Sequence, residues 1–241
     1  MLRAILSDLH GNLEALEAVL VDLDRRMVTS LACLGDFVGY GASPNECIDR
    51  LGPRLEVAVI GNHDLAACGG LQLGTFQSDA AIAAQWTGRH LRPESRSYLM
   101  SLPETVRWHG LRLVHATPSS PRAWHYVLSI ADATEEMMAF DERTCVVGHS
   151  HVPGAFVGDG DVVRYRRDAL LTIENEHRYL VNAGSVGQPR DGDPRAAYLL
   201  VDEDAKTLEH VRVEYDVETA MEKIRAAGLP SFLAERLRWG E

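Results

Sequence analysis

Short apolar runs that each end in acidic, imidazole or amide side chains restrict the fold of this chain most. Five such runs occur in the first 151 residues, each followed at once by a polar block. The pairs are Leu2–Leu6 with Ser7–Asn12, Leu31–Leu34 with Gly35–Asp36, Val57–Ile60 with Gly61–Asp64, Leu111–Val114 with His115, and Cys145–Val147 with Gly148–His151. Apolar runs of this length predict buried strands. Because the carboxyl ends of parallel strands share one edge of a sheet, the pattern predicts that the polar blocks meet there.

Helical spacing separates the first three runs. Apolar side chains from Leu13 to Leu23 recur at helical intervals, and Asn12 is placed to cap that helix. Pro44–Leu51 predicts a short helix with proline in its first turn. The resulting order of strand, helix, strand, helix, strand predicts a parallel sheet with right-handed crossovers.

The rest of the chain has a different pattern. Helices are predicted near Ser78–Leu91 and Pro93–Ser101, and we expect residues 76–103 to form a helical cap. A further helix is predicted near Thr134–Phe140. Beyond it the pattern is β-rich, with strands at Ala155–Val157, Val162–Tyr165, Tyr179–Val181, Ala197–Val201 and Leu208–Val213, and then helices near Val217–Ala227 and Ser231–Trp239. We interpret residues 1–241 as one domain with two sheets.

Composition excludes several classes of protein. The formal net charge is −11, so a basic surface for broad nucleic-acid binding, as a nuclease would carry, is not expected. No apolar stretch reaches the length of a membrane helix, and the N-terminus lacks the apolar region of a signal peptide. We therefore expect a cytoplasmic protein with no membrane partner. The four cysteines form no Cys-x-x-Cys pair, which favours free thiols.

The polar blocks contain seven candidate metal ligands. They are Asp8, His10, Asp36, Asn62, His115, His149 and His151. Carboxylate, imidazole and amide oxygen suit Mn²⁺, Fe²⁺, Zn²⁺, Co²⁺ or Ni²⁺, of which we favour Mn²⁺. Seven donors exceed what one four-coordinate ion needs, and they match two ions that share a carboxylate.

The ordered blocks resemble a known motif set. Asp8-x-His10, Gly35-Asp36, Gly61-Asn62-His63-Asp64, His115 and Gly148-His149-x-His151 are similar, without substitution, to the motifs of the calcineurin-like metallophosphoesterase superfamily. The stretch Asn182–Arg190 resembles a loop of its small prokaryotic branch of phosphodiesterases and phosphatases. The resemblance implies an α/β fold, a four-layer α/β/β/α sandwich of two mixed sheets flanked by helices.

The resemblance also implies a role for each residue. Asp8, His10, Asp36 and His151 would hold one ion, and Asp36, Asn62, His115 and His149 the other, with Asp36 bridging. A hydroxide shared by the two ions would attack phosphorus, while Asn62 helps to neutralise the phosphoryl oxygens. His63 would be a catalytic residue near the leaving oxygen instead of a ligand. Asp64 would orient the His63 ring and raise its pKa.

Substrate contacts are less sharply indicated. Tyr40, Arg122 and Arg190 are candidates for binding substrate, against the alternatives of a packed loop aromatic and of surface ion pairs. Trp124, His125 and Tyr126 follow Arg122 in a loop where a base or sugar could stack. An ordinary packed loop is the alternative reading of this segment.

The leading hypothesis is a dimetal phosphohydrolase that acts on phosphodiesters or phosphomonoesters, nucleotides among them. A dinucleoside polyphosphate hydrolase and a phosphoprotein phosphatase are alternatives within the same family. A non-catalytic scaffold of this fold is a remote one, because every block is intact. We favour a small phosphorylated or nucleotide substrate, since the predicted cap would narrow access for a folded protein.

Overall fold

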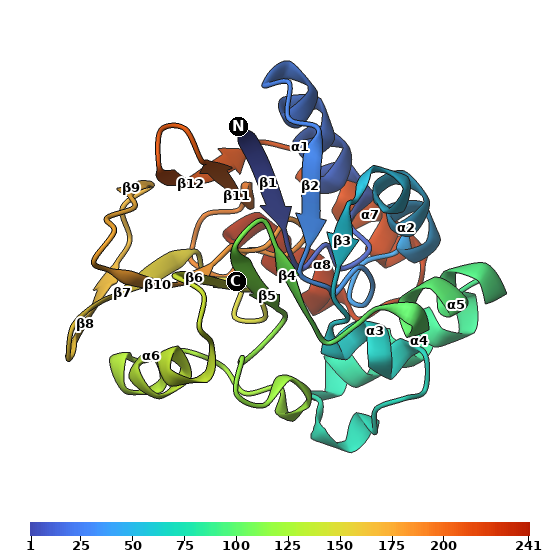
Figure 1. The fold of residues 1–241 in the computed structure, drawn as a ribbon. Coiled ribbons are helices and arrows are strands. Elements are labelled where there is room, and N and C mark those ends of the chain that lie inside the picture. The colour runs from blue at the N-terminus through green and yellow to red at the C-terminus, as the bar shows by residue number, and fades with distance from the viewer.

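Two six-stranded mixed sheets form the centre of the molecule (Figure 1). The computed structural model describes the backbone of residues 1–241 and every side chain except that of Thr75. The first sheet has the order β3 (Val57–Ala58), β2 (Ser30–Cys33), β1 (Leu2–Leu6), β11 (Ala196–Asp202), β12 (Thr207–Val213) and β9 (Leu170–Thr172). The second has the order β4 (Thr105–Trp108), β5 (Leu111–Val114), β6 (Thr144–Val147), β10 (Arg178–Asn182), β7 (Gly154–Asp159) and β8 (Val162–Arg166).

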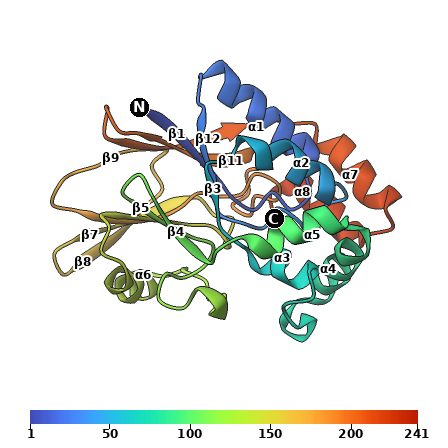
Figure 2. The ribbon, with the colours of Figure 1, turned by 45° about the vertical axis from the view of Figure 1, so that its right-hand side comes forward.

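Helices cover the outer faces of both sheets, which confirms the predicted four-layer class (Figure 2). On the first sheet lie α1 (Leu13–Arg25) and α2 (Pro44–Leu51), with α7 (Val217–Ala226) against α1 and α8 (Ser231–Trp239) against α7. On the second lies α6 (Ile130–Glu136). At one end, α3 (Asn62–Ala67) packs on α4 (Ser78–His90) and α5 (Pro93–Ser101). Within the described part of the chain, every helix is too short or too polar to cross a bilayer.

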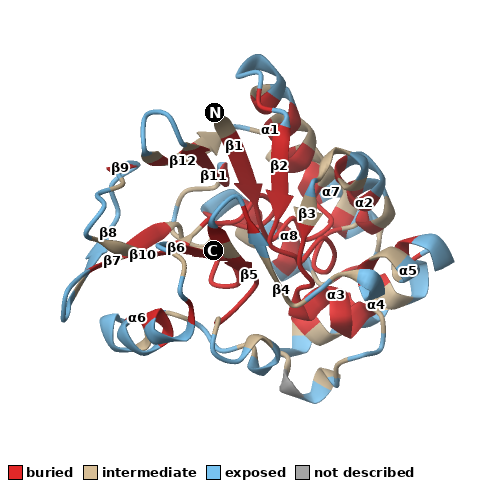
Figure 3. Cartoon of the chain, in the orientation of Figure 1, coloured by how far each residue is buried: buried red, intermediate tan, exposed pale blue. Residues whose placement is uncertain are grey.

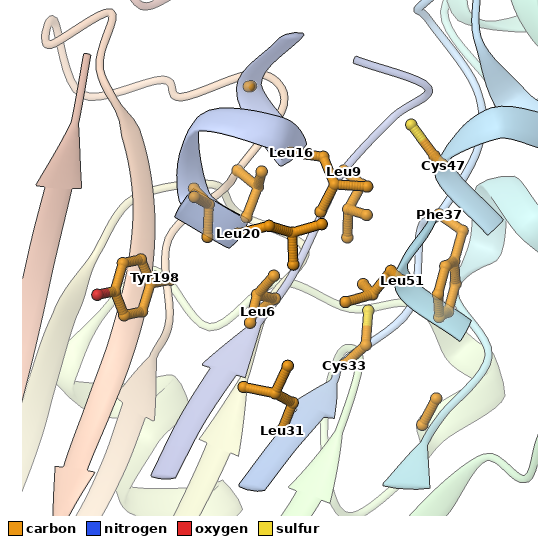
Figure 4. Packing of buried hydrophobic residues seen from close by; sticks show 14 of the residues in the cluster. Leu6, Leu9, Leu16, Leu20, Leu31, Cys33, Phe37, Cys47, Leu51 and Tyr198 are labelled. Atoms are coloured by element: carbon orange, nitrogen blue, oxygen red, sulfur yellow. The ribbon is translucent and has the colours of Figure 1, made fainter. Parts of the chain in front are cut away.

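Apolar clusters between the layers hold this arrangement together. Figure 4 shows one of them, where Leu16 and Leu20 of α1 meet Leu6 and Leu31 of the first sheet. Another lies between the sheets, where Ile5 and the wholly buried Val146 belong to one cluster. Complete burial of a leucine-sized side chain stabilises the fold by about 1.5–3 kcal/mol. All four cysteines are free thiols, as predicted.

The structure departs from the sequence prediction in several places, among them the unpredicted helix α3. Strands β4 and β9 were not predicted, because β4 has mixed burial and β9 spans three residues with Leu170 exposed. Helix α6 begins four residues before the predicted start, because Ser129 and Asp132 form a capping box there. The five polar blocks do not follow strands of one parallel sheet. β1, β2 and β3 run parallel in the first sheet, whereas β5 and β6 run parallel in the second.

Candidate metal centre

The loops that follow the strands are buried, which is unusual for connecting segments (Figure 3). Residues 7–12, 34–41, 59–61, 148–151 and 183–189 are all buried. They carry the carboxylates of Asp8 and Asp36 into the interior, where both residues have an exposed fraction of 0%. Because an ionised carboxylate is costly to bury alone, these loops must supply compensating partners.

The backbone is strained at the predicted ligands. Asp8, His10, Asp36, His149 and His151 have φ values of 53°, 51°, 52°, 67° and 61°. Residues with a Cβ seldom adopt this left-handed conformation, and such strain persists only where the surrounding structure enforces it. The enforced conformation turns five side chains from three loop segments toward one interior point, as the distances below show.

Each carboxylate has one oxygen anchored and one oxygen free. Asp8 Oδ2 accepts hydrogen bonds from the Ser7 hydroxyl and from the His149 amide, the latter at 3.1 Å. Asp36 Oδ1 accepts one from the His63 amide at 2.8 Å. Asp8 Oδ1 and Asp36 Oδ2 are buried and have no hydrogen-bond partner among the described residues. Two buried, unsatisfied anionic oxygens are the donors that a cation site requires.

The free oxygens face imidazole nitrogens. Asp8 Oδ1 lies 3.2 Å from His151 Nε2 and 3.7 Å from His10 Nε2. Asp36 Oδ2 lies 3.6 Å from His10 Nε2 and 3.4 Å from His115 Nε2. Asp36 Oδ2 therefore lies between two histidines that belong to different groups of donors, the position that a bridging ligand takes.

Main-chain carbonyls hold the four imidazoles. The ring nitrogens held in this way, with their carbonyl partners, are His10 Nδ1 with Val38 at 3.1 Å, His115 Nδ1 with Leu34 at 2.7 Å, His151 Nδ1 with Gln188 at 2.6 Å and His149 Nε2 with Trp124 at 2.9 Å. A carbonyl accepts only from N–H, so each ring keeps its other nitrogen available for a metal. The sequence did not predict these partners, because every residue has a main-chain carbonyl, whatever its type.

The donors fall into two groups that each suit a divalent ion. Ligand atoms of Asp8, His10 and His151 lie within 4.8 Å of one another, as do those of Asp36, His115 and His149. Asn62 Oδ1 lies 3.1 Å from His115 Nε2, beside the second group. The mixture of carboxylate, imidazole and amide oxygen fits two borderline divalent ions. All seven predicted ligands are therefore brought together.

His63 differs from these histidines. Its Nδ1 is buried without a hydrogen-bond partner among the described residues, so no carbonyl fixes its tautomer. Its ring lies 4.9 Å from the His10 ring, 4.4 Å from the Tyr40 ring and 5.0 Å from the Phe76 ring. Burial lowers the pKa of His63 well below its usual value, and the Asp36 charge opposes that shift. Phe76, which encloses this ring, was not predicted from sequence.

The expected role of Asp64 is wrong in one respect. Its Oδ2 accepts hydrogen bonds from the amides of Asp36 and Gly61, at 2.8 and 3.0 Å, and its Oδ1 accepts one from Val38 at 3.2 Å. Both oxygens are thus engaged by main chain, which explains why Asp64 does not orient the His63 ring or raise its pKa. Asp64 instead joins the loops after β2 and β3.

The metal-free centre is expected to bind a proton at His115. Burial lowers the pKa of His115, but the Asp36 carboxylate outweighs that effect and raises it to about 9. Because a metal must displace this proton, apparent metal affinity should rise with pH by about tenfold per unit up to pH 9. Titration calorimetry with Mn²⁺ at pH 7, in buffers of differing ionisation enthalpy, should detect about one proton released per protein. Release of none would contradict this assignment.

Gly61 lies in close contact with the Asp36 carboxylate. A Cβ at this position would lie 2.0 Å from Asp36 Oδ1 and 2.4 Å from the Asp36 amide. Gly61→Ala should therefore displace Asp36, lower metal content and destabilise the fold by about 1–3 kcal/mol, as overpacking does. Metal analysis and urea unfolding would measure both effects. Gly74→Ala, where a Cβ would meet open space, is the control. Full metal occupancy in Gly61→Ala would refute the contact.

A pocket of about 480 Å³ opens over the second group of donors. Asn62, His63 and His149 line it together with the aromatic side chains of Tyr40, Trp124 and Tyr126. The Tyr126 ring stacks on His149 with centroids 4.1 Å apart. Arg122 also lines the pocket, but its guanidinium pairs with Glu104. Tyr40 and Tyr126 are therefore better placed than Arg122 to contact a substrate.

The predicted cap, residues 76–103, reaches the pocket through its first residues. Phe76, Gln77 and Ala80 are lining residues. Helix α5 lies elsewhere, with Leu99 in the core against the first sheet. The start of this segment, instead of the whole segment, therefore borders the entrance.

Comparison with known proteins agrees with this geometry. The calcineurin-like phosphoesterase superfamily domain matches residues 1–206. MJ0912, an uncharacterized protein of Methanocaldococcus jannaschii, is 39% identical over 241 residues, covering 98% of this chain and 97% of that protein. The crystal structure of a metallophosphoesterase from Sphaerobacter thermophilus is 40% identical, with a TM-score of 0.89 over 100% of both chains. The hypothetical protein PH1004 from Pyrococcus horikoshii is 19% identical and shares the fold, with a TM-score of 0.81 over 100% of this chain and 98% of that one.

Proposed function

The chain belongs to the calcineurin-like phosphoesterase superfamily and is a metal-dependent phosphoesterase, and from this premise we propose that it hydrolyses small phosphodiesters or phosphomonoesters, nucleotides among them, in the cytoplasm. One observation carries the proposal. Two buried carboxylate oxygens without partners face imidazoles that carbonyls hold in place, and the neighbouring donors Asn62 and His149 line a pocket of about 480 Å³. A pocket of this volume suits a nucleotide-sized ligand.

Two divalent ions, with Mn²⁺ favoured, would occupy the two donor groups. Asp8, His10 and His151 would hold one and Asn62, His115 and His149 the other, with Asp36 between them. When bound, the ions supply Lewis-acid activation of a water nucleophile and of the phosphoryl oxygens. The chain itself fixes the ligand geometry and lines the pocket with aromatic side chains.

His63 would act on the leaving group. Its Nδ1 faces Gly39, where a Cβ would lie 2.7 Å away, so Nε2 is the ring nitrogen left to meet the leaving oxygen. A proton held there would stabilise the alkoxide that departs, by transfer or by a hydrogen bond. Asn62, which also lines the pocket, would donate its amide N–H to a phosphoryl oxygen.

The proposal is tested by reconstitution. Protein stripped with chelator should be inactive on bis(p-nitrophenyl) phosphate and p-nitrophenyl phosphate, and Mn²⁺ should restore turnover beyond the other divalent ions. A panel of nucleotides, dinucleoside polyphosphates and a phosphopeptide then separates the substrate classes. Turnover that survives complete metal removal, or absence of turnover with every ion and ester, would contradict the proposed function. Preference for the phosphopeptide would favour the phosphoprotein phosphatase alternative.

A further inference from the structure

A second pocket of about 360 Å³ adjoins the one over the metal centre. The two share Tyr40, Gln77, Ala80 and Tyr126 as lining residues. The Tyr40 ring lies between them, since its centroid is 4.4 Å from that of His63 in the first pocket and 5.6 Å from the Arg190 guanidinium carbon in the second. A ligand held at the metal centre can therefore extend past Tyr40 into the second pocket.

Helix α8 forms one wall of this second pocket. Leu233, Ala234 and Leu237 bury one side of the helix against α7. Phe232 and Arg236, four residues apart and thus on one face, line the pocket. The superfamily match ends at residue 206, so α8 lies outside the part of the chain that carries the metal motifs.

Two guanidinium groups line the pocket without an acidic side chain to pair with. Arg190 donates from Nη2 to Gln188 Oε1 at 2.8 Å and to the Tyr40 hydroxyl at 3.3 Å, while its Nε is buried with no partner among the described residues. Arg236 donates from Nε to the main-chain oxygen of Glu241. Within the described residues, no side-chain carboxylate lies within 4.0 Å of either guanidinium; Asp79 also lines the pocket, at a greater distance.

The two positive charges act on one another. Burial, and next the charge of Arg190, lower the pKa of Arg236. The Arg236 guanidinium also packs 5.3 Å from the Phe232 ring centroid, which fixes its position. Most other arginines of this chain are paired with a carboxylate, as Arg238 of the same helix is with Glu218. Neither guanidinium is paired with a side-chain carboxylate, although the charges of Glu241 and Asp79 partly offset that of Arg190 at Arg236. An anion that binds between the two arginines would form charge-assisted hydrogen bonds with both.

We propose that Arg190 and Arg236 form a subsite for a second phosphate group of the substrate. The substrate would then carry two phosphate groups, one at the metal centre and one between these arginines. This inference rests on the proposed function, and it narrows the substrate to organic bisphosphates and polyphosphate esters. Arg236 would be a residue that determines specificity and takes no part in the chemistry at phosphorus.

A substrate series tests the subsite. Linear diol bisphosphates with three to six methylenes are compared with the alkyl monophosphates of the same length, using Mn²⁺-loaded protein. Charge-assisted hydrogen bonds of a guanidinium to phosphate should raise kcat/KM for the best bisphosphate by about 10- to 100-fold over its monophosphate. Arg236→Gln should bring that ratio close to one, chiefly through KM, and Arg236→Lys should restore part of it. Arg238→Gln, on the exposed face of α8, should keep the wild-type ratio.

The outcomes separate this inference from the proposed function. Turnover of the monophosphates with no gain for any bisphosphate would overturn the subsite and leave the phosphoesterase assignment in place. An unchanged ratio in folded Arg236→Gln, checked by thermal unfolding, would also overturn it. Failure of every ester would instead count against the proposed function.

Discussion

Asp36→Asn is expected to empty both metal positions and to lower kcat by at least about 10³-fold. Removal of one preorganised group from an active site costs about 10²–10³-fold even where all else stays in place. Here the lost charge belongs to the carboxylate whose free oxygen lies 3.6 Å from His10 Nε2 and 3.4 Å from His115 Nε2. The amide has nearly the same shape and can still accept the hydrogen bond from the His63 main chain. Metal content by mass spectrometry and turnover of bis(p-nitrophenyl) phosphate measure the two effects.

Asp141→Asn is the matched control, because the Asp141 side chain is 98% exposed and lies on the surface. It should retain two ions and full turnover. Asp36→Asn protein that kept two ions per chain would show that Asp36 does not bridge. Loss of one ion alone would place Asp36 in a single donor group.

His63→Ala should keep both ions but lose about 10²–10⁴-fold in kcat on esters with poor leaving groups, the range that general acid catalysis supplies. Alkyl phosphates should show the full loss, whereas nitrophenyl esters, whose leaving oxygen needs little stabilisation, should show much less. The physical reason is the geometry of the ring, which lines the pocket and lacks the carbonyl partner that each ligand histidine has. Steady-state kinetics across leaving groups of graded pKa would measure the difference.

His90→Ala, an exposed histidine at the end of α4, serves as the control and should match wild type. An equal loss on alkyl and nitrophenyl esters would contradict leaving-group catalysis. A His63→Ala protein with one ion missing would instead make His63 a ligand, a role that its proximity to His10 and Asp36 allows.

The ligands were predictable from sequence because each follows directly on a short apolar strand. Asp8 lies two residues after β1 and His115 one residue after β5, so strand direction alone places them at the carboxyl ends of the strands. The two-sheet class followed from the resemblance and from the β-rich second half. The division of the polar blocks between the sheets was not predictable, because an apolar run does not specify which strand it pairs with.

Interactions between distant segments were not predictable for a different reason. The carbonyl of Gln188 that holds His151 and the amides that occupy Asp64 depend on main-chain positions. The distance from Arg236 to Arg190 depends on how α8 packs against α7, which residue type does not encode. The role of Asp64 was assigned wrongly because adjacency to His63 in the chain does not mean contact in space.

The carbonyl-held imidazoles bear on how the protein would acquire its ions. In many metalloproteins the ligands come together only when the ion arrives, so that loading and folding are one event. Here core residues such as Leu6 and Leu34 fix the strands, and the loops after them hold His10, His115 and His151 in left-handed or carbonyl-clamped positions. The free energy needed to position the ligands is then supplied during folding, by burial of the apolar core. Metal exchange would therefore be a local substitution within a rigid frame, with the identity of the bound ion set by its supply.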